Sequence, residues 1–304
     1  MLLFLEQLLN GLQFGVMLFL LAAGLTLVFG IMGLINLAHG SLYMLGAFAC
    51  AAVLALTGSF FLGVLAALAA AAAAGLAVEA IVLRRLYARG HLDQVLATFG
   101  LILFFNEAIR IVWGPRPLFL DVPAALAGTV EIIPGAPYPL YRLAIIVAGI
   151  GVAAALWWLV QRTRLGMLIR AGAADRDMLS ALGIDTRWLF AGVFALGALL
   201  AGLAGALAGP LFAVQIGMGE NILILTFVVI VIGGIGSIRG AIAGSLLVGM
   251  VDTLGRAYLP TALRLVADPA TADGVGAALA SMLIYLLMAA VLIWRPTGLF
   301  PAHA

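Results

Sequence analysis

Long runs of apolar residues dominate the chain, and short polar stretches separate them. The runs lie at about 8–31, 40–57, 60–84, 93–113, 141–161, 188–209, 222–255 and 272–294. A helix needs about 20 apolar residues to cross the hydrocarbon of a bilayer. The run at 222–255 is too long for one straight span, and the glycine-rich stretch 233–240 interrupts it. The pattern predicts an all-α polytopic membrane protein with about 8–9 transmembrane segments.

A second interrupted helix is expected near 30–41, where polar side chains enter an apolar run. The stretch GIMGLINLAHGSLYMLGAF covers residues 30–48. Backbone groups that a helix break frees inside lipid must find partners in the protein or in a water-filled cavity. Asn36 and His39 could act as caps of two helix ends, or they could line a translocation path. The two interpretations are compatible.

Glycines surround both interruptions. At the first, we expect Gly30 and Gly33 to allow close helix contact and Gly40 to allow the turn. GGIGSIRG at 233–240 repeats the order of apolar run, glycine cluster and polar residue, either as an internal repeat or by chance similarity of glycine-rich helices. In repeat-built transporters, matching interrupted segments mark the transport path. The candidate path residues are Asn36, His39, Gly40, Ser41, Gly233, Gly234, Gly236 and Ser237.

Two polar stretches differ in kind. Residues 114–141 hold six prolines and no helical period, which predicts a long extramembrane loop. Residues 162–187 hold five Arg and three Asp, with apolar residues at helical spacing. That pattern predicts an amphipathic helix outside the membrane. The helix would dock on a partner protein or lie on the inner lipid surface.

The arginines predict the orientation of the chain. Arg84, Arg85 and Arg89 flank one loop, and five more lie in 162–187. The positive-inside rule places both loops in the cytoplasm. The proline-rich loop 114–141 is then extracytoplasmic. Counting back through the helices places the N-terminus outside, provided that 30–40 reaches the inner face.

Composition supports a membrane protein and shows no catalytic set. Hydrophobic residues make up 65% of the 304 residues and charged residues 9%, with a mean hydropathy of +1.25, whereas soluble domains have roughly 25% charged residues. A net charge of +2 gives no indication of nucleic-acid binding. There is no G-x-x-x-x-G-K-[ST] loop, so no ATP site is expected in this chain. The three His lack metal-ligand spacing, and we expect no metal and no cofactor.

The remaining charges have local explanations. Glu107 and Arg110 lie at i,i+3, and Asp252 and Arg256 lie at i,i+4, which favours ion pairs within one helix. Glu79 is expected to reach toward Arg84 and Arg85, and Glu220 to cap a helix start. The lone Cys50 is interpreted as a small buried side chain.

Four motifs together resemble the LivH family, the permease subunits of branched-chain amino acid ABC importers. They are GLTLVFGIMGLINLAHGSLYMLGAF, IRAGAADRDMLSALGID, VVIVIGGIGSIRGAIAGSLLVG and the closing RPTGLF, in the family's order and over nearly the whole chain. The family often has an acidic residue where Ser41 stands here. The resemblance implies a single transmembrane permease domain over 1–304 with a cytoplasmic coupling loop at 162–187. The coupling residues would be Arg170, Ala173, Asp175, Arg176, Asp177 and Gly183.

The resemblance also implies the partners. They are a second, LivM-like permease subunit, two ABC ATPase subunits that bind ATP and Mg²⁺, a periplasmic solute-binding protein and the lipid of a bacterial inner membrane. The chain itself would be non-catalytic. Urea or short amides, or aromatic acids, are alternative solutes. A stand-alone secondary transporter is the alternative from another class. It would need an intramembrane charge relay, and it would leave 162–187 without a purpose.

Overall fold

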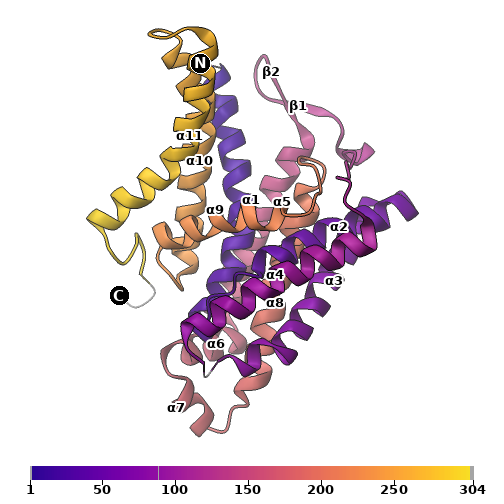
Figure 1. Cartoon of the computed structure of the whole chain (residues 1–304), viewed down its shortest axis with the longest axis vertical. Helices are drawn as coiled ribbons and strands as arrows, with labels where there is room; N and C mark the ends of the chain where they lie inside the picture. Colours follow the sequence, from indigo (N-terminus) through magenta and orange to yellow (C-terminus); the bar gives the residue numbers. More distant parts are fainter. Residues whose placement is uncertain (1, 88, 302–304) are drawn as a thin grey trace. The chain divides into compact units, whose positions relative to one another are not determined.

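The computed structural model describes residues 2–87 and 89–301, apart from the side chains of Ile133, Arg176 and Asp177 (Figure 1). Helices dominate the described part, which confirms the predicted all-α class. The elements are α1 (Leu2–Met32), α2 (His39–Thr57), α3 (Phe60–Ile81), η1 (Leu83–Arg85), α4 (His91–Trp113), η2 (Ala124–Leu126), β1 (Thr129–Ile133), β2 (Ala136–Pro139), α5 (Leu140–Arg162), α6 (Arg164–Ala174), α7 (Arg176–Ala181), α8 (Thr186–Ala208), α9 (Met218–Gly233), α10 (Ile238–Leu263) and α11 (Pro269–Trp294).

Eight helices of the described part are long and apolar enough to cross a membrane, and α9 is a shorter apolar helix. The predicted break of the run 222–255 is confirmed, since α9 ends at Gly233 and α10 begins at Ile238. Two helices are longer than predicted. The first helix begins at Leu2 rather than near residue 8, and α10 continues past 255 to Leu263.

The chain divides into two compact units. Unit 1 comprises Met1–Phe19, Ala124–Ile150 and Thr226–Ala304, and unit 2 comprises Leu20–Pro123 and Gly151–Leu225. Helices α1, α5 and α9 each contribute residues to both units. That the chain forms one transmembrane domain stays a prediction.

In unit 2, α2, α3 and α8 pack against one another (Figure 1). Small residues allow the close approach. A Cβ on Gly46 of α2 would lie 2.5 Å from Gly202 Cα of α8, and a Cβ on Gly63 of α3 would lie 2.9 Å from Cys50 Sγ. Cys50 is fully buried, as its interpretation as a small core side chain predicts.

The exposed face of α4, which belongs to unit 2, is apolar. Leu96 and Leu103 are exposed there, whereas Gln94 and Thr98 are buried. Most of these buried polar groups have local partners. Thr98 Oγ1 donates to the carbonyl of Gln94 at 2.8 Å, and Gln94 Nε2 donates to the carbonyls of Leu86 and Arg89. Gln94 Oε1 is buried and has no hydrogen-bond partner among the described residues. Apolar residues outside and polar residues inside are what lipid as the surrounding solvent requires.

In unit 1, α10 packs against α11 and against the first half of α1. A Cβ on Gly11 would lie 2.8 Å from Met250 Sδ, and a Cβ on Gly249 would lie 2.5 Å from the backbone nitrogen of Gly15. Asp268 caps α11, since its carboxylate accepts a hydrogen bond from Thr271 N–H at 3.0 Å. This hydrogen bond lowers the pKa of Asp268.

The loop 114–141 contains an antiparallel hairpin of β1 and β2 (Figure 1). Val130 pairs with Tyr138, and Gly135 makes the turn with φ +83°. Next to the hairpin, Arg142 Nη1 donates to Asn10 Oδ1 at 2.5 Å, which ties the start of α5 to α1. The sequence analysis predicted a long loop here and did not identify the hairpin, because the prolines in and beside β2 weaken a strand signal.

Candidate functional site

The first helix break, residues 33–38, joins α1 to α2, and its existence confirms the predicted interruption near 30–41. Gly33 ends α1 with φ +59°, and its N–H donates to the carbonyl of Phe29 at 2.8 Å. Asn36 Oδ1 accepts the N–H of Ala38 at 3.0 Å just before α2 begins. Asn36 is almost fully buried, so its amide satisfies a backbone group that lipid could not.

His39 places the start of α2 beside the middle of α1. Its Nε2 lies 3.2 Å from the carbonyl of Leu21, and a Cβ on Gly24 would lie 3.1 Å from its Cε1. Leu21 precedes the end of α1 at Met32 by about 16 Å of helix, at about 1.5 Å per residue. Residues 33–38 therefore run back along α1, which an extended stretch of that length can do at roughly 3.3 Å per residue.

The ring of His39 is fully buried, and its bond to a carbonyl requires a proton on Nε2. Nδ1 is buried and has no hydrogen-bond partner within the described residues. The capping interpretation predicted that His39 would pair with a backbone group, and it does, although that group belongs to α1 rather than to the break.

Two glycines exchange the roles that the sequence analysis gave them. Gly33, expected to allow close helix contact, makes the turn. Gly40, expected to make the turn, lies inside α2, where a Cβ would clash with the carbonyl of Gly219 in α9. Sequence could not separate the two roles, because both select a residue without a side chain.

The second helix break, residues 234–237, joins α9 to α10. Gly234 and Gly236 have φ of +107° and +83°. Ser237 Oγ accepts the N–H of Gly240 at 3.1 Å, which caps α10. A Cβ on Gly233 would clash with the carbonyl of Gly240, so the two helices approach each other at their ends.

The closing RPTGLF motif satisfies the end of α9. Leu299 N–H donates to the carbonyl of Ile232 at 2.9 Å, and Phe300 N–H donates to the carbonyl of Gly233 at 2.8 Å. The last carbonyls of a helix lack partners within that helix. The motif therefore stabilises the backbone at the second helix break. The sequence did not reveal this role, because α10 and α11 separate the motif from α9.

The eight candidate path residues fall into two groups. Asn36, His39, Gly40 and Ser41 belong to unit 2, and Gly233, Gly234, Gly236 and Ser237 belong to unit 1. Both breaks combine a glycine of positive φ with a side-chain oxygen that accepts a backbone N–H. That these residues line a path, and that the two breaks are an internal repeat, stay predictions.

The coupling segment, residues 162–187, forms two short helices rather than the single amphipathic helix that was expected. Asp175 is extended between α6 and α7, with φ −155° and ψ 109°. Its Oδ1 accepts the N–H of Met178 at 2.9 Å, so Asp175 starts α7 as a cap. Asp competes with the helix backbone for hydrogen bonds, which explains a break at this residue. As predicted for a residue at a helix end, Gly183, just after α7, is in the left-handed region, with φ +80°.

The other proposed coupling residues lie on the two short helices. Arg170 is exposed, and its guanidinium donates to the carbonyl of Val160 at the end of α5. Ala173 is half-buried near the end of α6. The side chains of Arg176 and Asp177 lie outside the described residues. The segment also exposes large apolar side chains, namely Leu165, Met167, Met178 and Leu182.

A polar pair that the sequence analysis did not predict joins α4 to α9. Asn106 Nδ2 donates to Glu220 Oε1 at 2.5 Å. The remaining acceptors, Asn106 Oδ1 and Glu220 Oε2, are buried and have no hydrogen-bond partner among the described residues. Glu220 was expected only to cap a helix start. No spacing rule connects two residues so far apart in sequence.

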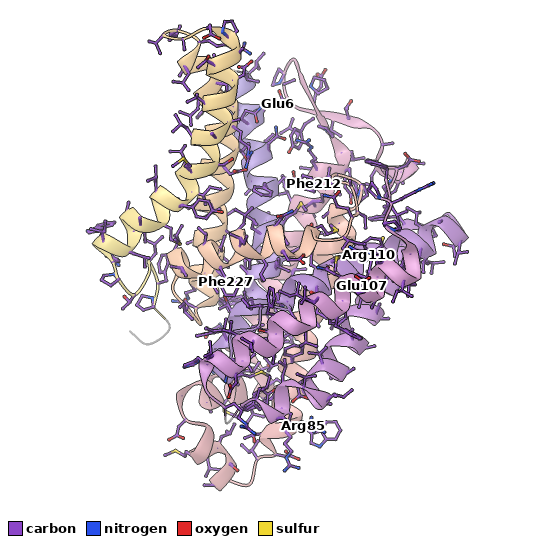
Figure 2. The ribbon with its side chains drawn as sticks, in the orientation of Figure 1. Glu6, Arg85, Glu107, Arg110, Phe212 and Phe227 are labelled. Atoms are coloured by element: carbon purple, nitrogen blue, oxygen red, sulfur yellow. The ribbon has the colours of Figure 1, made fainter. Side chains whose placement is uncertain are left out.

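Two ion pairs within helices are confirmed. Arg110 lies 3.2 Å from Glu107 on α4, and both side chains are exposed (Figure 2). Arg256 lies 2.9 Å from Asp252 on α10. Within residues 2–87 and 89–301, no three His, Cys, Asp or Glu side chains are grouped so that they could hold a metal ion.

Comparisons with known proteins extend over nearly the whole chain. A family model described as branched-chain amino acid transport system, permease component, matches residues 7–292. The chain is 33% identical to the high-affinity branched-chain amino acid transport system permease protein BraD of Pseudomonas aeruginosa, over 97% of this chain and 95% of BraD. It is 31% identical to the corresponding permease protein LivH of Escherichia coli, with the same coverage.

A more distant relative is a sugar permease. The ribose import permease protein RbsC of Escherichia coli is 28% identical over 77% of this chain and 72% of RbsC. No solved structure matches the chain.

Proposed function

Because the chain belongs to the family of permease components of branched-chain amino acid transport systems, we propose that it imports branched-chain or similar hydrophobic amino acids. It is a multi-pass protein of the inner membrane. The observation that carries the proposal is the match to BraD and LivH over 97% of the chain. The similarity to RbsC covers less of the chain at lower identity, so amino acids are the better-supported solutes.

The transporter would be assembled from several chains. We propose a second, LivM-like permease subunit, two ABC ATPase subunits and a periplasmic solute-binding protein, with the chain itself non-catalytic. ATP and Mg²⁺ would bind in the ATPase subunits. The coupling segment supports this arrangement, because it lies between α5 and α8 and exposes large apolar side chains next to arginines. Such a surface suits docking on a partner protein.

In this mechanism, ATP binding closes the ATPases and displaces α6 and α7. The displacement switches the path between outward-open and inward-open states. The two helix breaks are the places where the backbone could flex, because each has a glycine of positive φ. Solute affinity would reside mainly in the solute-binding protein, because a path lined by glycine, alanine and leucine would offer few groups for tight recognition.

Uptake into proteoliposomes tests the proposal. The chain, its partner permease and the ATPases are reconstituted, and labelled leucine is supplied with the solute-binding protein encoded beside them. We expect uptake that requires ATP inside the vesicle and that unlabelled isoleucine and valine inhibit. Competition by urea or an aromatic acid, without competition by leucine analogues, would assign the chain to another solute. Uptake by the chain alone along a proton or sodium gradient would exclude an ABC importer.

A further inference from the structure

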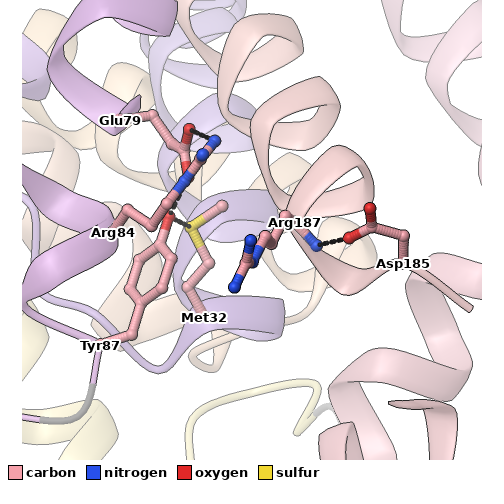
Figure 3. A network of polar contacts seen from close by, with 6 residues as sticks. All are labelled: Met32, Glu79, Arg84, Tyr87, Asp185 and Arg187. Atoms are coloured by element: carbon pink, nitrogen blue, oxygen red, sulfur yellow. Dashed lines mark hydrogen bonds and ion pairs between the residues drawn. The ribbon is translucent and has the colours of Figure 1, made fainter. Parts of the chain in front are cut away.

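A buried carboxylate stands at the end of α3. Glu79 is almost fully buried, and Arg84 binds it with two nitrogens, Nη2 to Oε2 at 2.8 Å and Nε to Oε1 at 3.3 Å (Figure 3). The expectation that Glu79 reaches Arg84 is confirmed, whereas Arg85 is exposed. A two-point contact between guanidinium and carboxylate fixes the orientation of both groups. Glu79 is therefore a rigid anchor.

Tyr87 attaches to this anchor and contacts two other helices. Its hydroxyl donates to Glu79 Oε1 at 3.1 Å and lies 3.6 Å from Met32 Sδ (Figure 3). Its ring meets Phe190 edge-on, with centroids 5.6 Å apart and planes at 87°. The bond to a fixed carboxylate restrains the phenol ring, so Tyr87 is held between Met32 and Phe190.

The two contacts connect Tyr87 to the end of α1 and to the start of α8, which both take part in the proposed transport mechanism. Met32 is the last residue of α1, immediately before the first helix break. Phe190 lies in the first turns of α8. The cap of this helix is Asp185 of the coupling segment, which accepts the N–H of Arg187 at 2.9 Å. Tyr87 therefore connects the exit of the coupling segment to the end of α1.

The coupling segment also lies close to the same end of α1. The space beside Gly172 of α6 is bordered by Leu179 of α7, Ile31 of α1 and Leu189 of α8, at 3.3, 3.7 and 3.7 Å from the position of a Cβ. The last two residues of α1 therefore lie close to the coupling segment in two ways: Ile31 borders the space beside Gly172 of α6, and Met32 is reached from α8 through Tyr87.

We propose that Tyr87 is a positioning residue that transmits displacement of the coupling segment to the end of α1, while Glu79 and Arg84 hold its hydroxyl in place. The inference rests on the proposed function. His39 is bonded to the middle of α1, and six residues separate Met32 from it. A shift of Met32 must therefore change the course of residues 33–38. That change is how motion of α6 and α7 reaches the first helix break.

The test uses the complete reconstituted importer and the variant Tyr87→Phe, which removes the hydroxyl and keeps the ring on Phe190. We measure assembly with the ATPases, solute-stimulated ATP hydrolysis, and solute imported per ATP hydrolysed. We expect normal assembly and continued hydrolysis, but a fall of about tenfold in solute imported per ATP, since a hydrogen bond to a charged group is lost. Phe190→Leu, which removes the ring edge and keeps the hydroxyl, should lower the same ratio.

The double variant Tyr87→Phe with Phe190→Leu should be no worse than the more damaging single variant, because both act on one connection. Two controls should leave the ratio unchanged. Tyr285→Phe makes the same change on an exposed residue of α11, and Glu107→Gln removes an exposed ion pair of α4.

Each result distinguishes a role of Tyr87 in transmitting the displacement from a role in stabilising the fold. An unchanged ratio in Tyr87→Phe overturns the proposal. Loss of assembly in Tyr87→Phe also overturns it, because the hydroxyl would then be needed for folding. Both results leave the proposed function intact as long as the unmodified importer transports leucine. Failure of the unmodified importer to take up any amino acid with ATP would instead remove the proposed function.

Discussion

At the scale of single residues, the absence of a side chain matters as much as any polar group. Gly40 of α2 and Gly219 of α9 lie so close that a Cβ on either would clash with the carbonyl of the other. By contrast, Gly151 of α5 has open space around the position of a Cβ. The same residue type therefore marks a helix contact in one place and none in another.

This difference gives a prediction for Gly40→Ala. The added methyl group would force α2 and α9 apart, and overpacking costs about 1–3 kcal/mol. We expect less folded protein after detergent extraction, a lower melting temperature of the purified complex and reduced uptake. Gly151→Ala is the matched control. It should be neutral or stabilise α5 by up to about 1 kcal/mol, because alanine is the better helix former. Equal behaviour of the two variants would show that α2 and α9 are not in close contact.

At the scale of elements, the coupling segment shows how local backbone preferences shape a docking surface. Asp175 divides it into α6 and α7, and Gly183 follows the end of α7 in the left-handed region. Gly183 has no neighbour within 4 Å of the position of a Cβ. Its conformation, rather than its size, is therefore the constraint.

We predict that Gly183→Val disrupts coupling and that Gly183→Asn largely preserves it. A β-branched residue resists the left-handed region at a cost of roughly 1–2 kcal/mol, whereas Asn enters it readily. Both variants should insert in the membrane in normal amounts, because residue 183 lies outside the candidate spans. Solute-stimulated ATP hydrolysis and uptake should fall in Gly183→Val alone. Normal uptake in that variant would contradict a role for the end of α7 in coupling.

At the scale of the whole molecule, the charge pattern predicts an orientation. The coupling segment carries five arginines and follows α5 in sequence. The loop with the hairpin β1–β2 precedes α5, so one membrane-spanning helix separates the two. Because cytoplasmic loops are enriched in Arg and Lys, the coupling segment should face the cytoplasm and the hairpin the outside.

Single cysteines test this orientation after Cys50→Ala removes the native thiol. Thr129→Cys lies in β1 and Ser180→Cys in α7, and both positions are exposed. A membrane-impermeant maleimide applied to spheroplasts should label Thr129→Cys at once and Ser180→Cys only after the membrane is opened. Labelling of Ser180→Cys from outside would reverse the orientation and remove the basis for docking on cytoplasmic ATPases.

The sequence by itself determined the membrane class, the position of almost every helix and both helix breaks. Apolar runs of spanning length admit few other structures, because backbone groups in lipid must be satisfied within the chain. It also predicted local devices that depend on neighbouring residues, such as the left-handed Gly183 and the pairing of Glu107 with Arg110.

Only the tertiary structure decided which residues of different helices contact one another. It placed His39 beside Leu21, joined Asn106 to Glu220 and brought Tyr87 between Met32 and Phe190. Glycine-rich and alanine-rich helices offer many nearly equivalent faces, so a one-dimensional pattern shows that a face can pack closely but does not identify its neighbour. The partners of small and buried polar residues are therefore fixed by the packing of whole helices.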